Sequence, residues 1–536
     1  MDGRVIPLKD ALSGVVERFG KWRLIFAVFL VCYAVILLLD LDYAPIQWDE
    51  TPHLLGGLTL NRGHLSQYLQ QYAFYPPLFD VAEILYYALL GPSVFSARLV
   101  SVTFCILSVG AVFEYTYRVY GTKNALLSSL LLASMPGLII LSRVALIETM
   151  MLFFFSASLF LFYFWIHTNS NKLLVLTGVT LGLAFISKYQ ALFSGVVMLV
   201  SIFLLYRKNI VKRLGKFVLI AIIALAVFLP WFCLVSQQFA TDIIGKWSYA
   251  MQVGNEERTV YSERFPQPVF YLIEMTYPYE HIHPISLPLY ALGLLGLGLW
   301  AWKRRDQDKF FLLWFAVIYV AFTLIPNKNW RYVITLFPIL AVSASNLTFF
   351  TWDKVKDFLK THRIGLRNPY LVKVAAAVFV VLIGASVVFS WSNAYSWVEQ
   401  DHVYIPIKDA TNYVSENSAL NESVVALFTG NFFSVDMIKF NLQTQEVGER
   451  EVWAYPSEPA DAYKPSLNVT ELVEECNSSN VKYLLLYEHG NITYFDSDWK
   501  SYYVLDQLVS SGNFTVETVF GTSPRRITVL QFTPNS

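Results

Sequence analysis

Residues 24–50 read LIFAVFLVCYAVILLLDLDYAPIQWDE. The first 17 of these residues are uncharged apart from Asp40 at their end. A helix needs about 20 predominantly apolar residues to cross a bilayer, so a run of this length can form a span. No small-residue cleavage pattern of a signal peptide precedes the acidic loop that follows. The stretch therefore predicts a retained membrane span that leads into a loop bearing Trp48, Asp49 and Glu50.

The composition indicates that this run is one of many. Hydrophobic residues make up 55% of the chain and charged residues 15%, and the mean hydropathy is +0.46. A soluble surface does not tolerate such values, whereas the formal net charge of +0 excludes no class. Eleven apolar runs occur, near residues 24–40, 97–117, 124–141, 148–166, 173–187, 190–206, 215–235, 286–302, 310–326, 331–350 and 371–391. We therefore predict a mainly α, polytopic membrane protein with about eleven transmembrane helices.

The positive charges alternate between connections. Basic residues gather before the first run and in every second connection, at Lys9, Arg18, Lys21, Arg23, Arg118, Lys123, Arg207, Lys208, Lys212, Arg213, Lys216, Lys303, Arg304, Arg305, Lys309 and throughout 354–373. Loops rich in Lys and Arg lie preferentially in the cytoplasm. We therefore expect a cytoplasmic N-terminus and, with eleven spans, a C-terminal tail on the extracytoplasmic side.

The tail carries an independent signal of the same orientation. Five Asn-x-Ser/Thr sequons lie in it, at Asn421, Asn468, Asn477, Asn491 and Asn513. Such sequons are glycosylated only on the extracytoplasmic side. We therefore expect the tail to be a glycosylated domain in the lumen of an endoplasmic reticulum-type membrane or outside the cell membrane of an archaeon.

Two domains follow from this pattern, a polytopic domain over residues 1–392 and an extracytoplasmic domain over residues 393–536. The apolar segment Leu78–Leu90 must not span if the parity of eleven holds. Asp80 and Glu83 near its start make a full crossing costly. We predict a re-entrant or interfacial helix there.

The extracytoplasmic domain is predicted to be a small α/β sandwich, because β-rich runs alternate with amphipathic ones. Strands are expected at Val424–Phe428, Val481–Tyr487, Thr515–Phe520 and Ile527–Phe532, and helices at Pro406–Val414, Phe433–Phe440 and Thr470–Cys476. Of the four cysteines only Cys476 lies in this domain, so no disulfide framework is available to it. Its stability must come from packing.

Several short motifs occur in a characteristic order along the polytopic domain. They are Trp48-Asp49-Glu50, Tyr75-Pro76-Pro77-Leu78, Ser96-Ala97-Arg98-Leu99, Ser142-Arg143 to Glu148, Gly182-Leu183 to Ser187-Lys188, and Lys328 to Arg331-Tyr332. With these motifs the chain resembles the GT-C membrane glycosyltransferases, and within them the protein O-mannosyltransferase and aminoarabinose-transferase group. Tyr75 departs from the His-Pro-Pro form common among relatives. The resemblance implies inverting transfer of a sugar from a polyprenyl phosphate to an acceptor on the outer or lumenal face.

The acidic pair fits such a transfer on chemical grounds. A single displacement at a sugar carbon needs a carboxylate to take the proton of the attacking hydroxyl. Asp49 and Glu50 are adjacent, so their side chains point in different directions; one can act as the base while the other orients the acceptor or a cation. The resemblance favours Asp49 as the base. The alternative is that both acidic residues only stabilise the N-terminus of a helix through its dipole.

The leaving phosphate needs cations. The candidates are Arg331, Lys328, Lys188 and Arg143, because Arg binds phosphate in a bidentate manner and Lys acts as a compact charge. Arg331 and Lys328 lie on the predicted outer side, where positive charge is disfavoured unless it has a task. The alternative is that these side chains extend from span ends toward the lipid headgroups.

Three further residues complete the predicted site. Glu148 stands where the family commonly has Asp, and could pair with a cation or bind the acceptor. His53, four residues after Asp49, could be a metal ligand or proton partner, or an ordinary surface histidine. Tyr332 follows Arg331 and could contact the acceptor. A divalent cation is left open as a cofactor, with His281 and His283 as further candidate ligands.

The sequence therefore predicts an integral membrane glycosyltransferase that transfers a hexose, mannose being favoured, from a polyprenyl phosphate carrier to a hydroxyl of a protein, glycan or lipid. The sequons favour a dolichyl over an undecaprenyl carrier. Membrane lipids are expected as surroundings, and no nucleic acid as a partner. The alternative is a non-catalytic polytopic protein, such as a lipid-carrier transporter or flippase, for which charged residues within spans and inverted repeats would be expected.

Overall fold

The structure is a computed structural model that describes residues 20–239, 252, 256–277, 283–361, 369–401, 404–430, 432–446, 448–456, 467–488, 501–523 and 525–534. The chain divides into two compact units. The first unit comprises Met1–Leu39, Leu69–Phe79 and Leu99–Trp397, and the second comprises Asp40–Tyr68, Asp80–Arg98 and Val398–Ser536. The loop that carries Asp49 and Glu50 therefore belongs to the same compact unit as the C-terminal domain.

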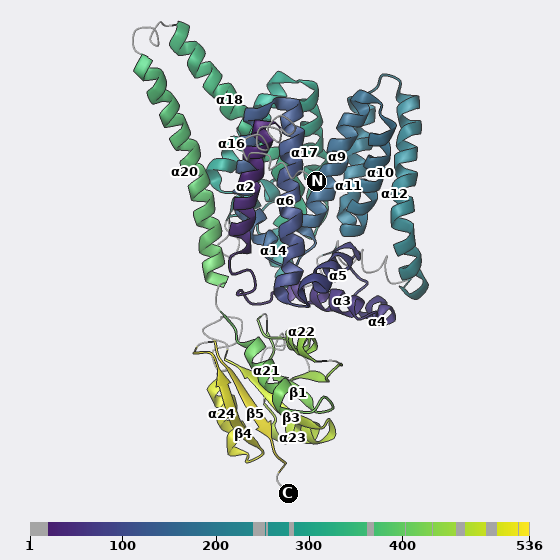
Figure 1. Cartoon of the computed structure of the whole chain (residues 1–536), viewed down its shortest axis with the longest axis vertical. Helices are drawn as coiled ribbons and strands as arrows, with labels where there is room; N and C mark the ends of the chain where they lie inside the picture. The colour runs from purple at the N-terminus through teal and green to yellow at the C-terminus, as the bar shows by residue number, and fades with distance from the viewer. Residues whose placement is uncertain are drawn as a thin grey trace, which may run out of the picture. The chain divides into compact units, whose positions relative to one another are not determined.

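The first unit is helical (Figure 1). Its helices are α2 (Lys21–Leu38), α6 (Val94–Tyr120), α7 (Thr122–Ala133), α8 (Pro136–Ser142), α9 (Glu148–Thr168), α10 (Asn171–Ser187), η2 (Tyr189–Ala191), α11 (Leu192–Leu204), α12 (Ile210–Phe239), α14 (Glu256–Glu263), η3 (Gln267–Val269), α15 (Phe270–Glu274), α16 (Leu287–Lys303), α17 (Asp306–Leu324), η4 (Trp330–Leu336), α18 (Phe337–Thr361) and α20 (Pro369–Asp401). Each of the eleven apolar runs in the sequence coincides with one of these helices or with a bent pair of them.

By length and composition, seven of the described helices can cross a membrane, or eight if the bent pair α7 and α8 forms one span. Three shorter apolar helices, Asn171–Ser187, Tyr189–Leu204 and Leu287–Lys303, account for the remaining predicted runs. The prediction of a mainly α membrane protein is confirmed, because these helices make up most of the first unit. The number of crossings stays a prediction.

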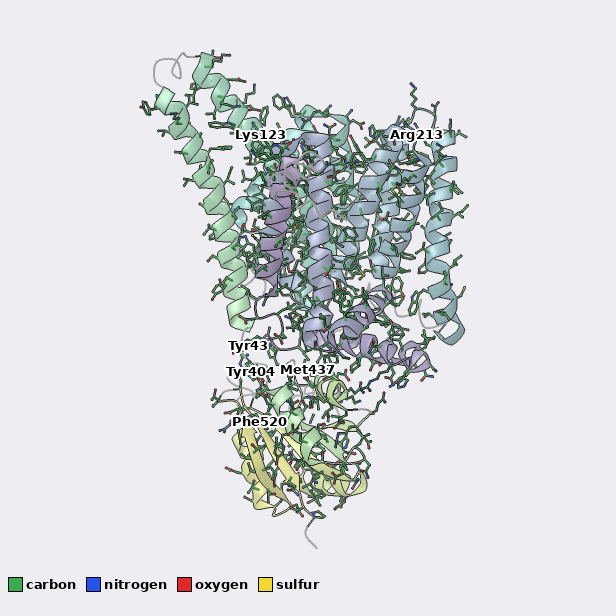
Figure 2. The ribbon with its side chains drawn as sticks, in the orientation of Figure 1. Tyr43, Lys123, Arg213, Tyr404, Met437 and Phe520 are labelled. Atoms are coloured by element: carbon green, nitrogen blue, oxygen red, sulfur yellow. The ribbon has the colours of Figure 1, made fainter. Side chains whose placement is uncertain are left out.

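Helices α9, α10, α11 and α12 lie side by side (Figure 1), and glycines let two of them approach closely. A Cβ atom on Gly178 of α10 would lie 2.7 Å from the Cβ atom of Ile223 on α12, and one on Gly182 would lie 2.6 Å from that of Val227. Small residues four positions apart are what membrane helices use for such contacts. Figure 2 shows Lys123, at the start of α7, and Arg213, in the first turn of α12, at the same end of the first unit, as expected for two basic connections on one side of a membrane.

The second unit contains the loop between α2 and α6 apart from Leu69–Phe79, and the C-terminal domain, which follows much later in the chain. The loop forms η1 (Trp48–Glu50), α3 (Thr51–Asn61), α4 (Leu65–Gln71) and α5 (Leu78–Leu90). The C-terminal domain forms α21 (Ile407–Asn417), β1 (Ser423–Leu427), α22 (Val435–Gln445), β2 (Val452–Tyr455), α23 (Val469–Ser478), β3 (Val481–Tyr487), α24 (Ser501–Ser510), β4 (Phe514–Phe520) and β5 (Ile527–Phe532). The predicted α/β character of this domain is confirmed.

The five strands form one sheet in the order β2-β1-β3-β5-β4. Strands β1, β2 and β3 are parallel, whereas β5 runs antiparallel to both β3 and β4. Central parallel strands are buried on both faces and are therefore almost continuously apolar, as the sequence VKYLLLY of β3 shows. The edge strand β4 is mostly exposed, which explains its alternating polar residues.

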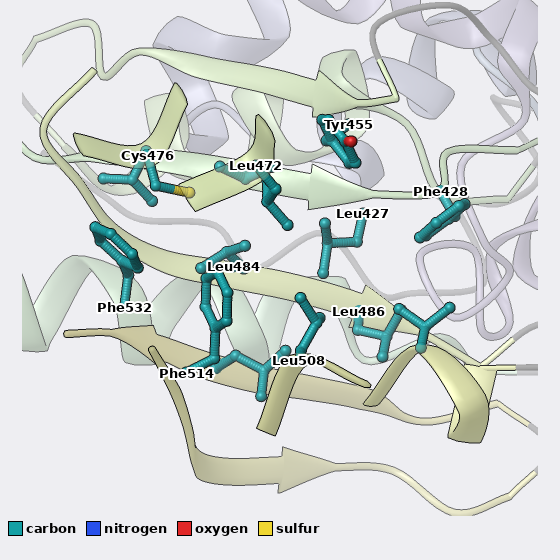
Figure 3. Close-up of a cluster of buried hydrophobic side chains, with 14 residues drawn as sticks. Leu427, Phe428, Tyr455, Leu472, Cys476, Leu484, Leu486, Leu508, Phe514 and Phe532 are labelled. Atoms are coloured by element: carbon teal, nitrogen blue, oxygen red, sulfur yellow. The ribbon is translucent and has the colours of Figure 1, made fainter. Parts of the chain in front are cut away.

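The core of the C-terminal domain lies between this sheet and the helices α23 and α24 (Figure 3). Leu427 and Leu484 of the sheet pack with Leu472 of α23 and Leu508 of α24, and Cys476 is buried among them. All four cysteines of the chain are free thiols. Packing therefore holds this domain together without a disulfide, as the position of Cys476 in the sequence indicated.

Two elements of the C-terminal domain, β2 and α24, were not predicted from the sequence. Strand β2 has only four residues and lies at the edge of the sheet, directly before the cis peptide bond Tyr455-Pro456. So short a run of apolar residues next to a proline gives no strand pattern by itself. Helix α24 reads SYYVLDQLVS, in which aromatic and β-branched residues suggest neither element clearly.

Candidate active site

The predicted base lies on a short 3-10 helix of the second unit. Helix η1 begins after Gln47, whose backbone N–H donates to Oε2 of Glu50 at 2.8 Å, and Pro52 stands in the first turn of α3 that follows. This capping interaction and the proline fix where the helix starts. Asp49 is exposed, whereas Glu50 is fully buried. The two adjacent carboxylates therefore differ in exposure to solvent.

Glu50 forms a buried ion pair with Arg98, at the start of α6. Arg98 donates from Nε to Oε1 of Glu50 at 2.8 Å and from Nη2 to Oε2 at 2.7 Å. Its remaining N–H groups donate to the carbonyl oxygens of Leu41, Ala44 and Pro45 at 2.8 to 3.1 Å. Both side chains are 0% exposed. Arg98 thus holds Glu50 and the backbone of the loop that leads to Asp49.

This geometry changes the interpretation of Glu50 as a catalytic residue. A carboxylate that accepts two guanidinium hydrogen bonds in a buried site is occupied. Arg98 thus occupies the Glu50 carboxylate, and Asp49 is the exposed member of the predicted catalytic pair. Sequence reasoning gave Arg98 no role of its own, although an arginine within the apolar start of α6, VFSARLVSVTF, is a signal that it has a partner.

His53 takes part in a second buried network of the same loop. Its Nδ1 atom lies 2.8 Å from Oδ1 of Asp80 on α5, and the hydroxyl of Tyr68 donates to Oδ2 of Asp80 at 2.7 Å. All three side chains are buried. A carboxylate bonded to Nδ1 fixes the orientation of an imidazole ring. His53 is therefore a buried partner of Asp80, and the alternative of an ordinary surface histidine is wrong.

Glu83, one turn after Asp80 on α5, is a buried carboxyl group whose oxygens lack hydrogen-bond partners among the described residues. It is 0% exposed, and within the described residues neither of its carboxylate oxygens makes a hydrogen bond. A Cβ atom on Gly57 would lie 2.0 Å from its Oε2 atom, so a larger residue at position 57 would force the Glu83 side chain to move. Burial, and then the nearby charges of Asp80 and Glu50, raise the pKa of Glu83 well above its usual value. Both effects favour the neutral form of this carboxyl group.

We expect Glu83→Gln to make stability less dependent on pH. Because its pKa is raised on folding, Glu83 binds its proton more tightly in the folded than in the unfolded protein. The free energy of unfolding therefore falls as pH rises from about 4.3 toward the raised pKa, by up to about 1.4 kcal/mol per pH unit. A glutamine amide cannot ionise and removes this loss. The apparent Tm of the variant should therefore change less than that of the wild type between about pH 5 and pH 7. The exposed Glu416→Gln is the control, and equal slopes in all three proteins would contradict a neutral Glu83.

In the first unit, two of the predicted cations meet at one carboxylate. Oε1 of Glu148, at the start of α9, lies 2.9 Å from Nζ of Lys188 and 3.8 Å from Nη1 of Arg331. Nζ of Lys188 also lies 5.7 Å from the ring centre of Tyr332. Two positive charges thus face the carboxylate of Glu148. We call this group, Glu148, Lys188, Arg331 and Tyr332, the Glu148 cluster.

The other two predicted cations contact the backbone. The ammonium of Lys328 donates to the carbonyl oxygens of Phe322, at 2.9 Å, and Thr323 near the end of α17, and burial lowers the pKa of Lys328 to about 8. Nη1 of Arg143 donates to the carbonyl oxygen of Leu37 at 2.7 Å. Lysine and arginine side chains favour such positions at helix C-termini. Lys188 and Arg331 thus meet at Glu148, whereas the contacts described for Lys328 and Arg143 are to backbone carbonyl oxygens.

No group of three or more His, Cys, Asp or Glu residues in the described part of the chain could hold a metal ion. His283 has its Nδ1 atom 2.6 Å from the carbonyl oxygen of Thr276, and His281 lies outside the described residues. A divalent cation stays an open prediction.

Comparisons with known proteins bear on this arrangement. The family model described as dolichyl-phosphate-mannose-protein mannosyltransferase matches residues 75–233. A curated relative, undecaprenyl phosphate-alpha-4-amino-4-deoxy-L-arabinose arabinosyl transferase 2 of Proteus mirabilis strain HI4320, is 26% identical over 309 residues, which are 55% of this chain and 53% of the relative. The match thus spans about half the length of that relative.

Solved structures match over more of the chain. The crystal structure of ArnT from Cupriavidus metallidurans bound to undecaprenyl phosphate has a TM-score of 0.64 at 14% identity and covers 94% of this chain and 98% of that one. The Archaeoglobus fulgidus oligosaccharyltransferase complex with Zn and sulfate has a TM-score of 0.54 at 14% identity and covers 85% of this chain and 67% of that one. At such identities the likeness establishes the fold.

Proposed function

From the GT-C glycosyltransferase fold of this chain, we propose that it transfers a sugar from a polyprenyl phosphate to an acceptor hydroxyl with inversion at the anomeric carbon. The observation that carries the proposal is the contrast within the acidic pair: Asp49 is exposed, while buried Arg98 holds Glu50 and the preceding loop. An exposed carboxylate on a fixed backbone is what a general base requires.

In the proposed reaction, particular side chains take the proton of the acceptor and stabilise the leaving phosphate. The acceptor oxygen attacks the anomeric carbon and forms the new glycosidic bond while its proton passes to Asp49. The bond between that carbon and the phosphate oxygen breaks, and the electron pair leaves with the phosphate. Lys188 and Arg331 of the Glu148 cluster stabilise the negative charge that develops there. Glu50 and Arg98 keep Asp49 in place and do not touch the substrates.

The donor is proposed to be a dolichyl-phosphate hexose, with mannose favoured. The family match to the dolichyl-phosphate-mannose-protein mannosyltransferases supports mannose, and the sequons support a dolichyl carrier. ArnT, in contrast, was crystallised with undecaprenyl phosphate. The acceptor is proposed to be a protein, a glycan or a lipid, since each presents an alcohol to Asp49.

The proposal is tested with purified protein in lipid nanodiscs and radiolabelled dolichyl-phosphate-mannose and dolichyl-phosphate-glucose. The wild type should release label from one donor, and Arg331→Ala should bind that donor about tenfold or more weakly, since a hydrogen bond to a charged group contributes about 1.5 to 3 kcal/mol. Arg207→Ala, an exposed arginine between α11 and α12, is the matched control. An unchanged donor affinity in Arg331→Ala would remove Arg331 from the phosphate site. Absence of both turnover and donor binding in the wild type would favour a non-catalytic protein.

The proposed extracytoplasmic position of the C-terminal domain predicts a glycan at Asn468. Its side-chain oxygen accepts the N–H of Glu471 at 3.3 Å as the cap of α23, and a glycan on its nitrogen leaves that oxygen available. Thr470→Ala removes the sequon but keeps the cap. In a host that performs N-glycosylation, this variant should therefore lose the mass of one glycan without a change in stability. Thr533→Ala, which changes no sequon, is the control. If glycosidase treatment does not change the mass of the wild type, the proposed extracytoplasmic position of the domain is contradicted.

A further inference from the structure

Arg62 connects the acidic loop to the C-terminal domain within the second unit. It follows the last residue of α3, and its two Nη atoms donate to three backbone carbonyls at the end of α22. The acceptors are Gln443, Glu446 at 3.1 Å and Gly448 at 3.4 Å. The last carbonyls of a helix have no partner within the helix and carry partial negative charge, so a guanidinium satisfies them and neutralises the end.

Two further contacts join the same parts of the chain. Nε2 of Gln67 donates to Oε1 of Glu449 at 2.9 Å. The rings of Tyr43 and Tyr404 stack with their centres 5.6 Å apart, and Figure 2 shows them as neighbours. Tyr43 precedes Asp49 in the chain and Arg62 follows it. The loop is therefore attached to the C-terminal domain on both sides of the candidate base.

The attachment continues into the C-terminal domain through Arg450. Its guanidinium, 5% exposed, pairs with Glu446 at 2.7 Å and donates to the carbonyl oxygens of Ser418, Ala419 and Glu422 before β1. The end of α22 that Arg62 contacts is thus fixed to the segment that leads into the sheet. A contact with this end is a contact with the body of the domain and not with a separate loop.

We propose that Arg62 is a positioning residue that keeps the C-terminal domain fixed relative to Asp49, so that an acceptor held by that domain is presented to the base. This inference rests on the proposed function for its catalytic consequence. A reacting hydroxyl must be held within hydrogen-bond distance of its base, and small displacements lower the rate steeply. The acceptor is accordingly a macromolecule, large enough to contact the domain and the acidic loop at once.

The attachment is tested without a substrate, by pulsed electron paramagnetic resonance on the full chain in nanodiscs. Spin labels replace His64 after α3 and Gln507 on α24, both exposed, and the exposed Cys32 and Cys233 become serine. Arg62→Ala should widen the distance distribution at least about twofold, because three hydrogen bonds are lost. Arg62→Lys, which keeps the charge, should restore part of the narrow distribution.

The matched control is Arg526→Ala. Arg526 pairs with Glu488 inside the C-terminal domain, 2.6 Å apart, so its removal should leave the distribution at the wild-type width. An unchanged width in Arg62→Ala would overturn the proposal, and so would equal widening in Arg526→Ala, since the effect would then not be specific to the contact with α22.

A second measurement separates positioning from general damage. In membranes supplied with radiolabelled dolichyl-phosphate-mannose, label transferred to macromolecules should fall about tenfold in Arg62→Ala, whereas label released as free sugar should not change. Equal loss of both would indicate a structural defect and overturn the acceptor role. If the wild type transfers no label at all, the proposed function fails, and the resonance measurement still decides whether Arg62 fixes the domain.

Discussion

Asp49→Asn should lower the rate of sugar transfer by about 10³-fold, within the 10²- to 10⁴-fold range of general base catalysis. The amide keeps the shape of the side chain but cannot take the proton of the attacking hydroxyl. Because Asp49 is exposed and η1 is capped by Glu50, the substitution should leave the fold and the affinity for the donor unchanged. The measurement is loss of label from the donor under single-turnover conditions, together with donor binding by the same sample.

The matched control is Asp42→Asn, an exposed carboxylate in the same loop. It should retain the wild-type rate, because it removes one negative charge from the loop but leaves the proposed base Asp49 in place. A similar loss in Asp42→Asn and Asp49→Asn would indicate that the charge of the loop matters and not a specific base. A wild-type rate in Asp49→Asn would remove Asp49 from the chemistry.

Arg98→Met should reduce the free energy of unfolding by about 3 to 5 kcal/mol, the range found when one partner of a buried ion pair is removed. The carboxylate of Glu50 would be left without its partner, and the carbonyl oxygens of Leu41, Ala44 and Pro45 would lose their donors. The double variant Glu50→Gln with Arg98→Met should be less destabilised than Arg98→Met, because it removes the stranded charge.

The control for this prediction is a similar pair at the surface. Arg23 donates to both oxygens of Glu114, at 3.1 and 2.8 Å, but the side chains are 40% and 36% exposed. Exposed pairs contribute about 0 to 1 kcal/mol, so Arg23→Met should change thermal unfolding little. Equal shifts in the apparent Tm of Arg98→Met and Arg23→Met would show that the buried pair does not hold the loop.

The sequence predicted the elements of this fold well, because their signals are local. The apolar runs, the segment Leu78–Leu90 and the strand Val481–Tyr487 are each recognisable from a few consecutive residues. Strand β2 was missed for the same reason, since its four residues become a strand only through their pairing with β1.

The contacts of the site could not be predicted in this way. Glu50 and Arg98 are 48 positions apart, and His53 and Asp80 are 27 apart, so no spacing rule brings them together. Asp49 and Glu50 are chemically alike, and no local pattern shows that Glu50 is buried while Asp49 is exposed. Lys328 and Arg331 look equivalent as well, yet one contacts the end of α17 and the other Glu148.

The Glu148 cluster also bears on how the enzyme would complete a cycle. Polyprenyl phosphate leaves the reaction with more charge than the donor carried, so two bare cations would retain the spent carrier. Glu148 already contacts Lys188 and Arg331, and it can compete with the carrier for both of them. If Lys188 and Arg331 hold the phosphate as proposed, the carboxylate would be an internal counter-ion that takes the place of the departing phosphate. Glu148 would then assist product release and reset the site for the next donor.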